Sequence, residues 1–162
     1  MGGNLADALE TLVLAPGDLG RMRALMAMFA GAFENPEAYL GRQPSDAYLA
    51  TQLAKPHVIV IVGMFGDEVV GGLVAYQLDK LEQERREIYV YDLAVDERWR
   101  RRGVATGVIA ALQQEAARRD AYVIFVQADL EDAPAIALYE KLGAGELARH
   151  FDIEPAQRGG EK

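Results

Sequence analysis

Three consecutive arginines precede a glycine near the middle of the chain. Arg100, Arg101 and Arg102 are followed directly by Gly103, and Ala105 lies two residues further on. Guanidinium groups grip phosphate oxygens in a bidentate way, and a helix start offers unpaired N–H groups together with the positive end of the helix dipole. Glycine lets the backbone approach an anion without an intervening Cβ atom. This spacing therefore predicts a phosphate-binding turn at the start of a helix.

An arginine run before a helix also occurs as ordinary solvated surface, so the triplet alone leaves two interpretations open. Helix starts normally favour acidic residues, and this chain is acidic, with 17 Lys and Arg against 25 Asp and Glu. Three clustered arginines are best explained by a bound anion. The net charge of −8 repels a nucleic-acid backbone and favours a cationic partner, although an acidic excess can also serve solubility alone.

The composition excludes several kinds of chemistry. Among 162 residues there is no cysteine, and the two histidines are His57 and His150. Disulfides, thiolate ligands and cysteine nucleophiles are therefore excluded, and a zinc site is not expected. No apolar run approaches the roughly 20 residues needed to cross a bilayer, and the N-terminus does not resemble a secretory signal. We expect a cytoplasmic protein without a membrane span, built as one domain over residues 1–162 whose ends, 1–9 and 156–162, are frayed.

Hydrophobic periodicity and capping residues predict the elements that position the arginine turn. Their order is β-α-α-β-β-β-α-β-α-β, which indicates an α+β sandwich around a mixed sheet. Along the chain they are a strand at 11–15, a helix capped by Asp18, a loop holding Pro36, Gly41 and Pro44, a helix capped by Ser45 through Ala54 with Tyr48, Leu49 and Leu53 inward, strands at 58–65, 69–78 and 87–95, a helix from Gly103 to Arg119, a strand at 122–128, a helix from Pro134 to Leu142, and a last strand at 146–153.

Side-chain alternation along the strand 87–95 assigns its residues to two faces. Ile88, Val90 and Asp92 are predicted to share one face of the sheet. The intervening residues, Tyr89, Tyr91 and Leu93, are predicted to share the other.

The segment YDLAVDERWRRRGVAT resembles the acetyl-CoA motif of the GNAT superfamily of N-acetyltransferases. Three further segments resemble the class I aminoglycoside 3-N-acetyltransferases, which confer gentamicin resistance: IYVYDLAV (88–95), AYVIFVQADLEDAPAIALYEKLG (121–143) and HFDIEP (150–155). The similarity is dense from about Leu73 to Pro155 and thin before it. It implies a GNAT fold in which the strands 87–95 and 122–128 are parallel and splay apart.

The resemblance implies acetyl-CoA as the acyl donor and no metal. Its pantetheine would lie in the gap between the two strands and pair with main-chain groups of Leu93 and Val95, while the amides of 101–106 would hold the pyrophosphate. The expected cofactor-binding residues are Leu93, Ala94, Val95, Arg100, Arg101, Arg102, Gly103, Val104, Ala105 and Thr106.

Direct acetyl transfer needs a neutral amine, a route for its proton and a group that receives charge as the thiolate leaves. No cysteine or serine–histidine–acid constellation suggests an acyl-enzyme. Tyr139 falls where GNAT enzymes often keep a tyrosine near the coenzyme A sulfur, so it is the expected general acid; a core tyrosine is the alternative. The resemblance places Asp92 in the substrate pocket, where it would orient the amine or relay its proton through water. A carboxylate with a pKa near about 3.9 is a poor base for an ammonium near about 8 unless burial raises its pKa, and a structural salt bridge is the alternative role.

An aminoglycoside carries several ammonium groups, so the resemblance implies an acidic acceptor pocket. Asp129 and Asp152 are the favoured members, with Glu154 and His150 as further candidates. Glu87 and Asp132 fit either the pocket or the solvated surface.

Three functions remain open at this stage. An aminoglycoside acetyltransferase is favoured, a polyamine or protein N-terminus is the alternative acceptor, and a catalytically silent acetyl-CoA sensor is the third. The resembled family often pairs into homodimers, so a homodimer is a further expectation. Trp99 occupies a turn position where family members usually carry a smaller or polar residue, and the sequence assigns it no role.

Overall fold

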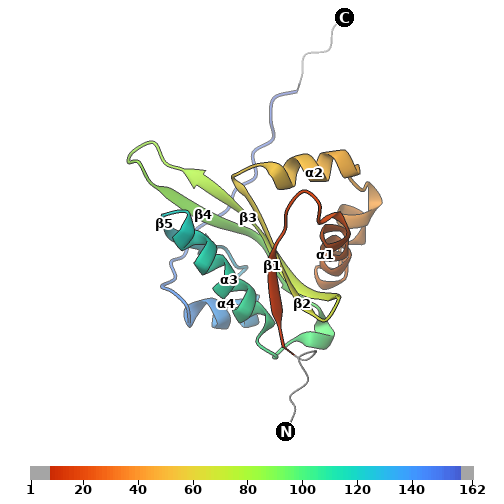
Figure 1. Ribbon diagram of the computed structural model, residues 1–162. Helices are drawn as coiled ribbons and strands as arrows, with labels where there is room; N and C mark the ends of the chain where they lie inside the picture. The colour runs from red at the N-terminus through yellow and green to blue at the C-terminus, as the bar shows by residue number, and fades with distance from the viewer. Residues whose placement is uncertain (1–7, 158–162) are drawn as a thin grey trace, which may run out of the picture. The chain divides into compact units, whose positions relative to one another are not determined.

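A five-stranded mixed sheet organises the chain up to Gln127 (Figure 1). The computed structural model describes residues 8–157. The strands lie in sequence order across the sheet, with antiparallel neighbours from β1 to β4 and a parallel pair between β4 and β5. They are β1 (Glu10–Val13), β2 (Val58–Phe65), β3 (Glu68–Asp79), β4 (Arg86–Val95) and β5 (Ala121–Val126).

Helices cover both faces of this sheet. As Figure 1 shows, α1 (Leu19–Ala32) and α2 (Asp46–Ala54) lie on one face and α3 (Val104–Arg118) lies on the other. A single π-helical turn, η2 (Glu37–Gly41), joins α1 to α2, and a 3-10 turn, η3 (Glu97–Trp99), leads from β4 towards α3. The predicted α+β layering around a mixed sheet is confirmed.

The buried side chains form two clusters, one on each face of the sheet. The α1-side core includes Leu25, Phe29, Leu49, Val60 and Val62. The α3-side core includes Ile59, Ile61, Ile88, Val90, Val104, Val108 and Leu112. Residues that alternate along one strand therefore enter different cores, as the period of two in a strand requires.

Two adjacent glycines in β3 let the helices approach the sheet. A Cβ atom on Gly72 would lie 2.6 Å from both Leu25 Cδ1 of α1 and the Ile61 carbonyl oxygen. A Cβ atom on Gly71 would lie 2.6 Å from Val104 Cγ1, at the start of α3. The absence of a side chain at Gly71 therefore sets how closely the first turn of α3 lies against the sheet.

The residues from Ala128 onward form a second unit, described here by itself. It contains α4 (Ala133–Glu140), in which Pro134 lies in the first turn and the Asp132 carboxylate accepts a hydrogen bond from the Ala135 N–H. The predicted strand at 146–153 is wrong, because these residues have no regular secondary structure. Frayed ends were expected at residues 1–9 and 156–162, and of these 1–7 and 158–162 lie outside the described residues.

Several local expectations can now be judged. The strand 58–65 and the Ser45 cap of α2 are confirmed, since Ser45 Oγ accepts from the Tyr48 N–H. Tyr48 itself was expected inward but is 56% exposed, because it lies on the opposite side of α2 from Leu49 and Leu53. Asp18 stands at the start of α1 without capping it; its carboxylate accepts from the Ala15 N–H instead. The expected loop around Gly41 contains the η2 turn.

Candidate functional site

The C-terminal half of β4 has a hydrogen-bonding partner on one side only. β4 pairs with β3 as far as Val95, but its parallel pairing with β5 ends at Val90 and Val126. No strand of the described chain pairs with residues 91–95 on the β5 side. The two parallel strands thus part at Val90, and main-chain groups of β4 become available where the family resemblance implies the pantetheine of acetyl-CoA.

The turn between β4 and α3 contains two residues in the left-handed region. Arg101 has φ 62° and Gly103 has φ 78°. Left-handed residues in a tight turn bring successive N–H groups to one concave side, which suits an anion. Gly103 is the N-cap of α3, and no side chain caps the helix; the first N–H with a helical partner there is that of Gly107, which donates to the Gly103 carbonyl. The amides that precede it are therefore available to a ligand.

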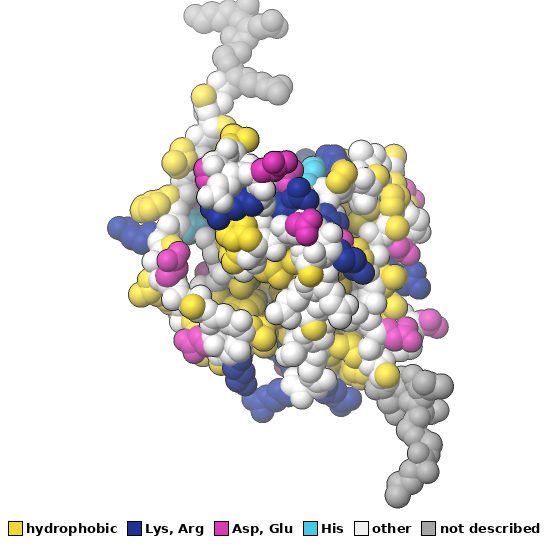
Figure 2. All heavy atoms as spheres, turned by 60° about the vertical axis from the view of Figure 1, so that its left-hand side comes forward, with side chains coloured by type: hydrophobic (Ala, Val, Ile, Leu, Met, Phe, Trp, Pro, Cys, Tyr) yellow, Lys and Arg dark blue, Asp and Glu magenta, His cyan; other side chains and the backbone are white. Residues whose placement is uncertain are grey.

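The three arginines of this turn differ from most other arginines of the protein. Among the described residues, Arg100, Arg101 and Arg102 form no ion pair, although seven other arginines do: Arg21, Arg23, Arg85, Arg86, Arg98, Arg118 and Arg119. The three side chains are exposed, and Arg100 Nε also donates to the Val95 carbonyl at 3.4 Å. Figure 2 shows Lys and Arg side chains both along the lower edge and in the upper part of the drawn face. Unpaired guanidinium groups beside unpaired amides favour a phosphate ligand.

Several of the other expected cofactor residues can offer a ligand only their main-chain groups, because their side chains pack into the core. The side chains of Leu93 and Val95 pack towards the α3-side core and that of Ala94 towards the α1-side core. Val104 is buried against the sheet. Their main-chain groups are what remains for a ligand, which agrees with a pantetheine paired like a strand and a pyrophosphate held by amides. A Cβ atom on Gly103 would meet nothing within 4 Å, so the turn is open on that side.

A β-bulge sets the direction of Asp92. Ala75 of β3 pairs with Val90, whereas the next residue back, Val74, pairs with Asp92, so Tyr91 is an extra residue in β4. A bulge shifts the alternation of all later side chains by one position. Val90 belongs to the α3-side core, but Asp92 points to the α1 side, where Tyr39 contacts it. The prediction that Asp92 shares a face with Ile88 and Val90 is therefore wrong.

Asp92 is partly buried and has one hydrogen-bonding partner. The Tyr39 hydroxyl, on η2, donates to Asp92 Oδ1 at 3.3 Å. Burial raises the pKa of the Asp92 carboxyl above its usual value, and the Tyr39 hydrogen bond lowers it again in part. Burial, the Asp92 charge and this hydrogen bond together raise the pKa of Tyr39 to about 12, so its hydroxyl stays protonated and donates. Asp92 forms no salt bridge among the described residues, which argues against a purely structural ion pair.

Besides Tyr39, two further tyrosines lie near this carboxylate, Tyr76 and the adjacent Tyr91. Tyr76 and Tyr91 meet edge to face with ring centroids 6.1 Å apart, and Tyr91 meets Tyr89 in the same way at 5.9 Å. Tyr89 stacks on Phe125 of β5 at 4.7 Å. Burial first, and then the Asp92 charge, raises the pKa of Tyr76. Aromatic faces attract cations, so a carboxylate among these rings makes a site suited to an ammonium group.

Sequence reasoning missed Tyr39 and Tyr76 as members of the site. Tyr39 lies 53 residues before Asp92, in a segment expected to be a loop, and it reaches the carboxylate only because η2 holds its ring against Phe29 at 5.9 Å and Phe33 at 5.7 Å. The one available signal was the number of tyrosines, seven in the chain.

The remaining predicted site residues belong to the second unit. Tyr139 lies on α4, and Asp129, His150, Asp152 and Glu154 lie in the same unit. Within that unit His150 Nε2 contacts Asp152 Oδ1 at 2.8 Å, so these two candidates lie together.

Two acidic candidates have protein partners in the structure. Glu87 accepts from the Tyr122 hydroxyl and lies 3.7 Å from Lys80 Nζ. Asp132 caps α4. Both carboxylates thus have structural roles.

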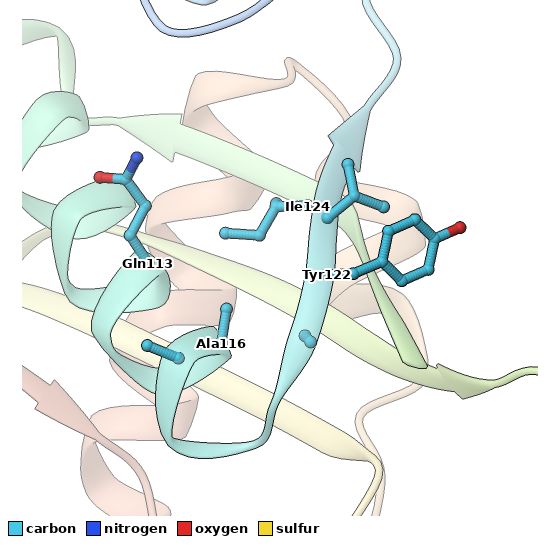
Figure 3. Close-up of a pocket in the computed structure, with 7 residues that line it drawn as sticks. Gln113, Ala116, Tyr122 and Ile124 are labelled. Carbon is cyan, nitrogen blue, oxygen red and sulfur yellow. The ribbon is translucent and has the colours of Figure 1, made fainter. Parts of the chain in front are cut away.

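A hollow of about 220 Å³ lies between the last turns of α3 and β5 (Figure 3). It is lined by Gln113, Ala116, Ala117, Ala121, Tyr122, Val123 and Ile124. In Figure 3 the Tyr122 ring points away from α3. These residues lie at the opposite end of α3 from Gly103, so the hollow is separate from the predicted phosphate turn.

Within residues 8–157, no three acidic or histidine side chains are grouped so that they could hold a metal ion. In the same range, none of the helices combines the length and the apolar character needed to cross a membrane.

Comparison with known proteins agrees with this geometry. The sequence profile of the Acetyltransferase (GNAT) family matches residues 23–144. The crystal structure of the aminoglycoside acetyltransferase HMB0005, from an uncultured soil metagenomic sample, is 48% identical with a TM-score of 0.90, covering 92% of this chain and 99% of that chain. The aminoglycoside acetyltransferase meta-AAC0020 in complex with sisomicin, also from an uncultured soil metagenomic sample, is 29% identical with a TM-score of 0.86, covering 94% of this chain and 100% of that chain.

The chain also matches part of a curated protein. N-alpha-acetyltransferase 30 of Xenopus laevis is 29% identical over 85 residues, which are 52% of this chain and 31% of that protein. The match thus spans about a third of the curated relative's length. The predicted GNAT fold and family resemblance are confirmed, and the chain belongs to the GNAT acetyltransferase family, whose members use acetyl-CoA.

Proposed function

We propose that this protein transfers the acetyl group of acetyl-CoA directly to an amine of an aminoglycoside, at the 3-amino group of gentamicin-type compounds, and so confers resistance. The observation that carries the proposal is the partly buried Asp92 carboxylate beside the unpaired edge of β4, among Tyr39, Tyr76 and Tyr91. It gives an ammonium a place next to the expected path of the pantetheine.

The cofactor part of the proposal depends on three features of the described chain. Unpaired amides at the start of α3, and the side chains of Arg100, Arg101 and Arg102, which form no ion pair among the described residues, fit a pyrophosphate. The main chain of Leu93 and Val95 fits the pantetheine amides. Acetyl-CoA would supply the activated acetyl group, and no metal would take part.

The acceptor part of the proposal depends on charge and on the comparisons. The chain has a net charge of −8, and two similar structures are of aminoglycoside acetyltransferases, one of them holding sisomicin. Asp92 would orient the acceptor ammonium and accept or relay its proton, and burial brings its pKa closer to that of an amine. In the second unit, Asp129, His150, Asp152 and Glu154 would bind other ammonium groups, and the Tyr139 hydroxyl would donate a proton to the departing sulfur.

The second candidate acceptor is a protein N-terminus, because N-alpha-acetyltransferase 30 matches 85 residues of the chain. Tyrosine rings around one carboxylate also suit a single ammonium. We further propose a single functional domain over residues 1–162, a cytoplasmic location and a homodimer.

One assay separates these proposals. Thiol release from acetyl-CoA is measured with gentamicin, with spermidine, with a peptide that has a free N-terminus, and without acceptor. We expect release with gentamicin only, and the new acetyl group on the 3-amino nitrogen by NMR. Gentamicin already acetylated at that nitrogen is the matched control and should give no release. Release with the peptide alone would support the N-terminal activity, and no acceptor-dependent release would refute both enzyme proposals.

A further inference from the structure

Trp99 is the single tryptophan of the chain, and it ends η3 immediately before the arginine turn. Its indole stacks on Phe65 at the end of β2, with ring centroids 4.6 Å apart and 21° between the planes. The guanidinium carbon of Arg102 lies 5.0 Å from the indole centroid. The Trp99 ring thus lies between Phe65 and Arg102 and contacts both.

Packing alone does not account for a tryptophan at this position. The Trp99 Nε1 atom is buried and has no hydrogen-bonding partner among the described residues. A buried N–H without a partner disfavours folding, and a phenylalanine would stack on Phe65 without one. What the indole adds is its ring face, which attracts a cation more strongly than a phenyl ring does. The indole at position 99 is therefore best explained by its contact with the Arg102 guanidinium.

Arg102 needs an external support to hold one conformation. It lies between Arg101 and Gly103, both in the left-handed region, and its exposed side chain forms no ion pair among the described residues. An arginine held only by solvent loses rotamer freedom when it binds a phosphate, which weakens binding. Contact with a rigidly packed ring removes part of that loss in advance.

We infer that Trp99 is a positioning residue that holds the Arg102 guanidinium at the start of α3, ready for a phosphate of coenzyme A. The inference rests on the proposed use of this turn by acetyl-CoA. The aromatic and cation contacts of the Trp99 ring are with Phe65 and Arg102, so Trp99 acts through Arg102, affects the binding of the cofactor and leaves the transfer step unchanged.

The test measures coenzyme A binding to the purified full chain by calorimetry. Trp99→Leu keeps an apolar side chain but removes the ring, and we expect Kd to rise about 3- to 10-fold, the range of an exposed to partly desolvated cation–π contact. Arg102→Gln should weaken binding at least as much. The double variant should bind no more weakly than Arg102→Gln alone, because both changes remove one interaction. Trp99→Phe keeps an aromatic face but a weaker one, so its Kd should lie between those of the wild type and Trp99→Leu.

A matched control distinguishes the loss of Arg102 positioning from a general loss of positive charge in the turn. Arg98→Gln removes an arginine from the same turn, but Arg98 is paired with Asp96 and Glu68, and we expect its Kd for coenzyme A to stay within twofold of the wild type. The KM for acetyl-CoA should rise in Trp99→Leu without a change in kcat. Unchanged affinity in Trp99→Leu, or multiplying effects in the double variant, would overturn the inference.

A fluorescence measurement keeps the test decisive if Trp99→Leu does not fold. Emission of the single tryptophan should change on titration of the wild type with coenzyme A, at the calorimetric Kd, and the change should shrink to less than half in Arg102→Gln. Equal changes in both proteins, or no change in a wild type that binds coenzyme A, would refute the positioning role. If the wild type binds no coenzyme A at all, the proposed function itself fails.

Discussion

The hydrogen bond from Tyr39 to Asp92 can be removed without disturbing the packing around it. In Tyr39→Phe the ring keeps its contacts with Phe29 and Phe33 and loses only the hydroxyl that donates to Asp92 Oδ1. That hydrogen bond lowers the pKa of Asp92, so its loss must raise the pKa further above the usual value. The sign of the effect is therefore fixed by the structure.

The size of the shift follows from the geometry of the hydrogen bond. A hydrogen bond to a charged group contributes about 1.5–3 kcal/mol, but the O···O distance of 3.3 Å is longer than usual, so about 1 kcal/mol is reasonable. A free energy of about 1 kcal/mol changes the protonation equilibrium of Asp92 about fivefold, in the direction of a higher pKa. Below that pKa the ionised fraction of Asp92, and with it the rate, should fall about fivefold relative to the wild type.

The assay is the pH dependence of kcat/KM for the acceptor, because this parameter reports the free enzyme. The acceptor amine titrates identically in both experiments, so the ratio of wild-type to Tyr39→Phe values isolates Asp92. We expect a ratio near one at high pH that rises to about five at low pH. Tyr48→Phe, an exposed tyrosine on α2, is the control and should give a flat ratio. A flat or inverted ratio for Tyr39→Phe would refute the reasoning.

Three further substitutions test other parts of the site. Asp92→Asn should remove most transfer activity without lowering Tm at pH 7. Burial raises the pKa of Asp92 in the folded state, so the charged carboxylate opposes folding above that pKa and its loss should not destabilise the protein. A lowered Tm measured by calorimetry would contradict this. Gly103→Ala should cost about 1 kcal/mol from its left-handed φ and weaken coenzyme A binding, whereas Gly66→Ala, with a similar φ of 58°, should lower Tm alike and leave binding intact. Tyr139→Phe should reduce kcat on the order of 100-fold with an unchanged Kd for coenzyme A, and an unchanged rate would dismiss its role as general acid.

Local patterns determined much of the fold. The aliphatic run 58–65 is bounded by Pro56 and the hairpin at Gly66, so both ends of β2 could be predicted to the residue. The arginine turn could be predicted because the features that make it bind anions, a glycine N-cap and clustered guanidinium groups, are adjacent in sequence. Signals of this kind need no knowledge of distant contacts.

The facing of Asp92 and its partner could not be predicted, because both depend on long-range pairing. The bulge at Tyr91 is defined by how β4 pairs with Val74 and Ala75 of β3. The alternation of side chains along β4 alone does not reveal it. The contact with Tyr39 depends on how η2 packs against α1. The segment 146–153 shows the converse: an alternating pattern permits a strand, but a strand forms only where a partner offers hydrogen bonds.

The unpaired edge of β4 at residues 91–95 also bears on the behaviour of the protein without its cofactor. An open strand edge is a template for any extended chain, and it is a common origin of aggregation. A pantetheine arm lying along this edge would occupy the hydrogen-bonding groups that another polypeptide could otherwise take. Coenzyme A would then act as a chaperone-like ligand, stabilising the fold by about 2.7 kcal/mol at a hundredfold excess over its Kd. Cells depleted of it should accumulate this protein in insoluble form.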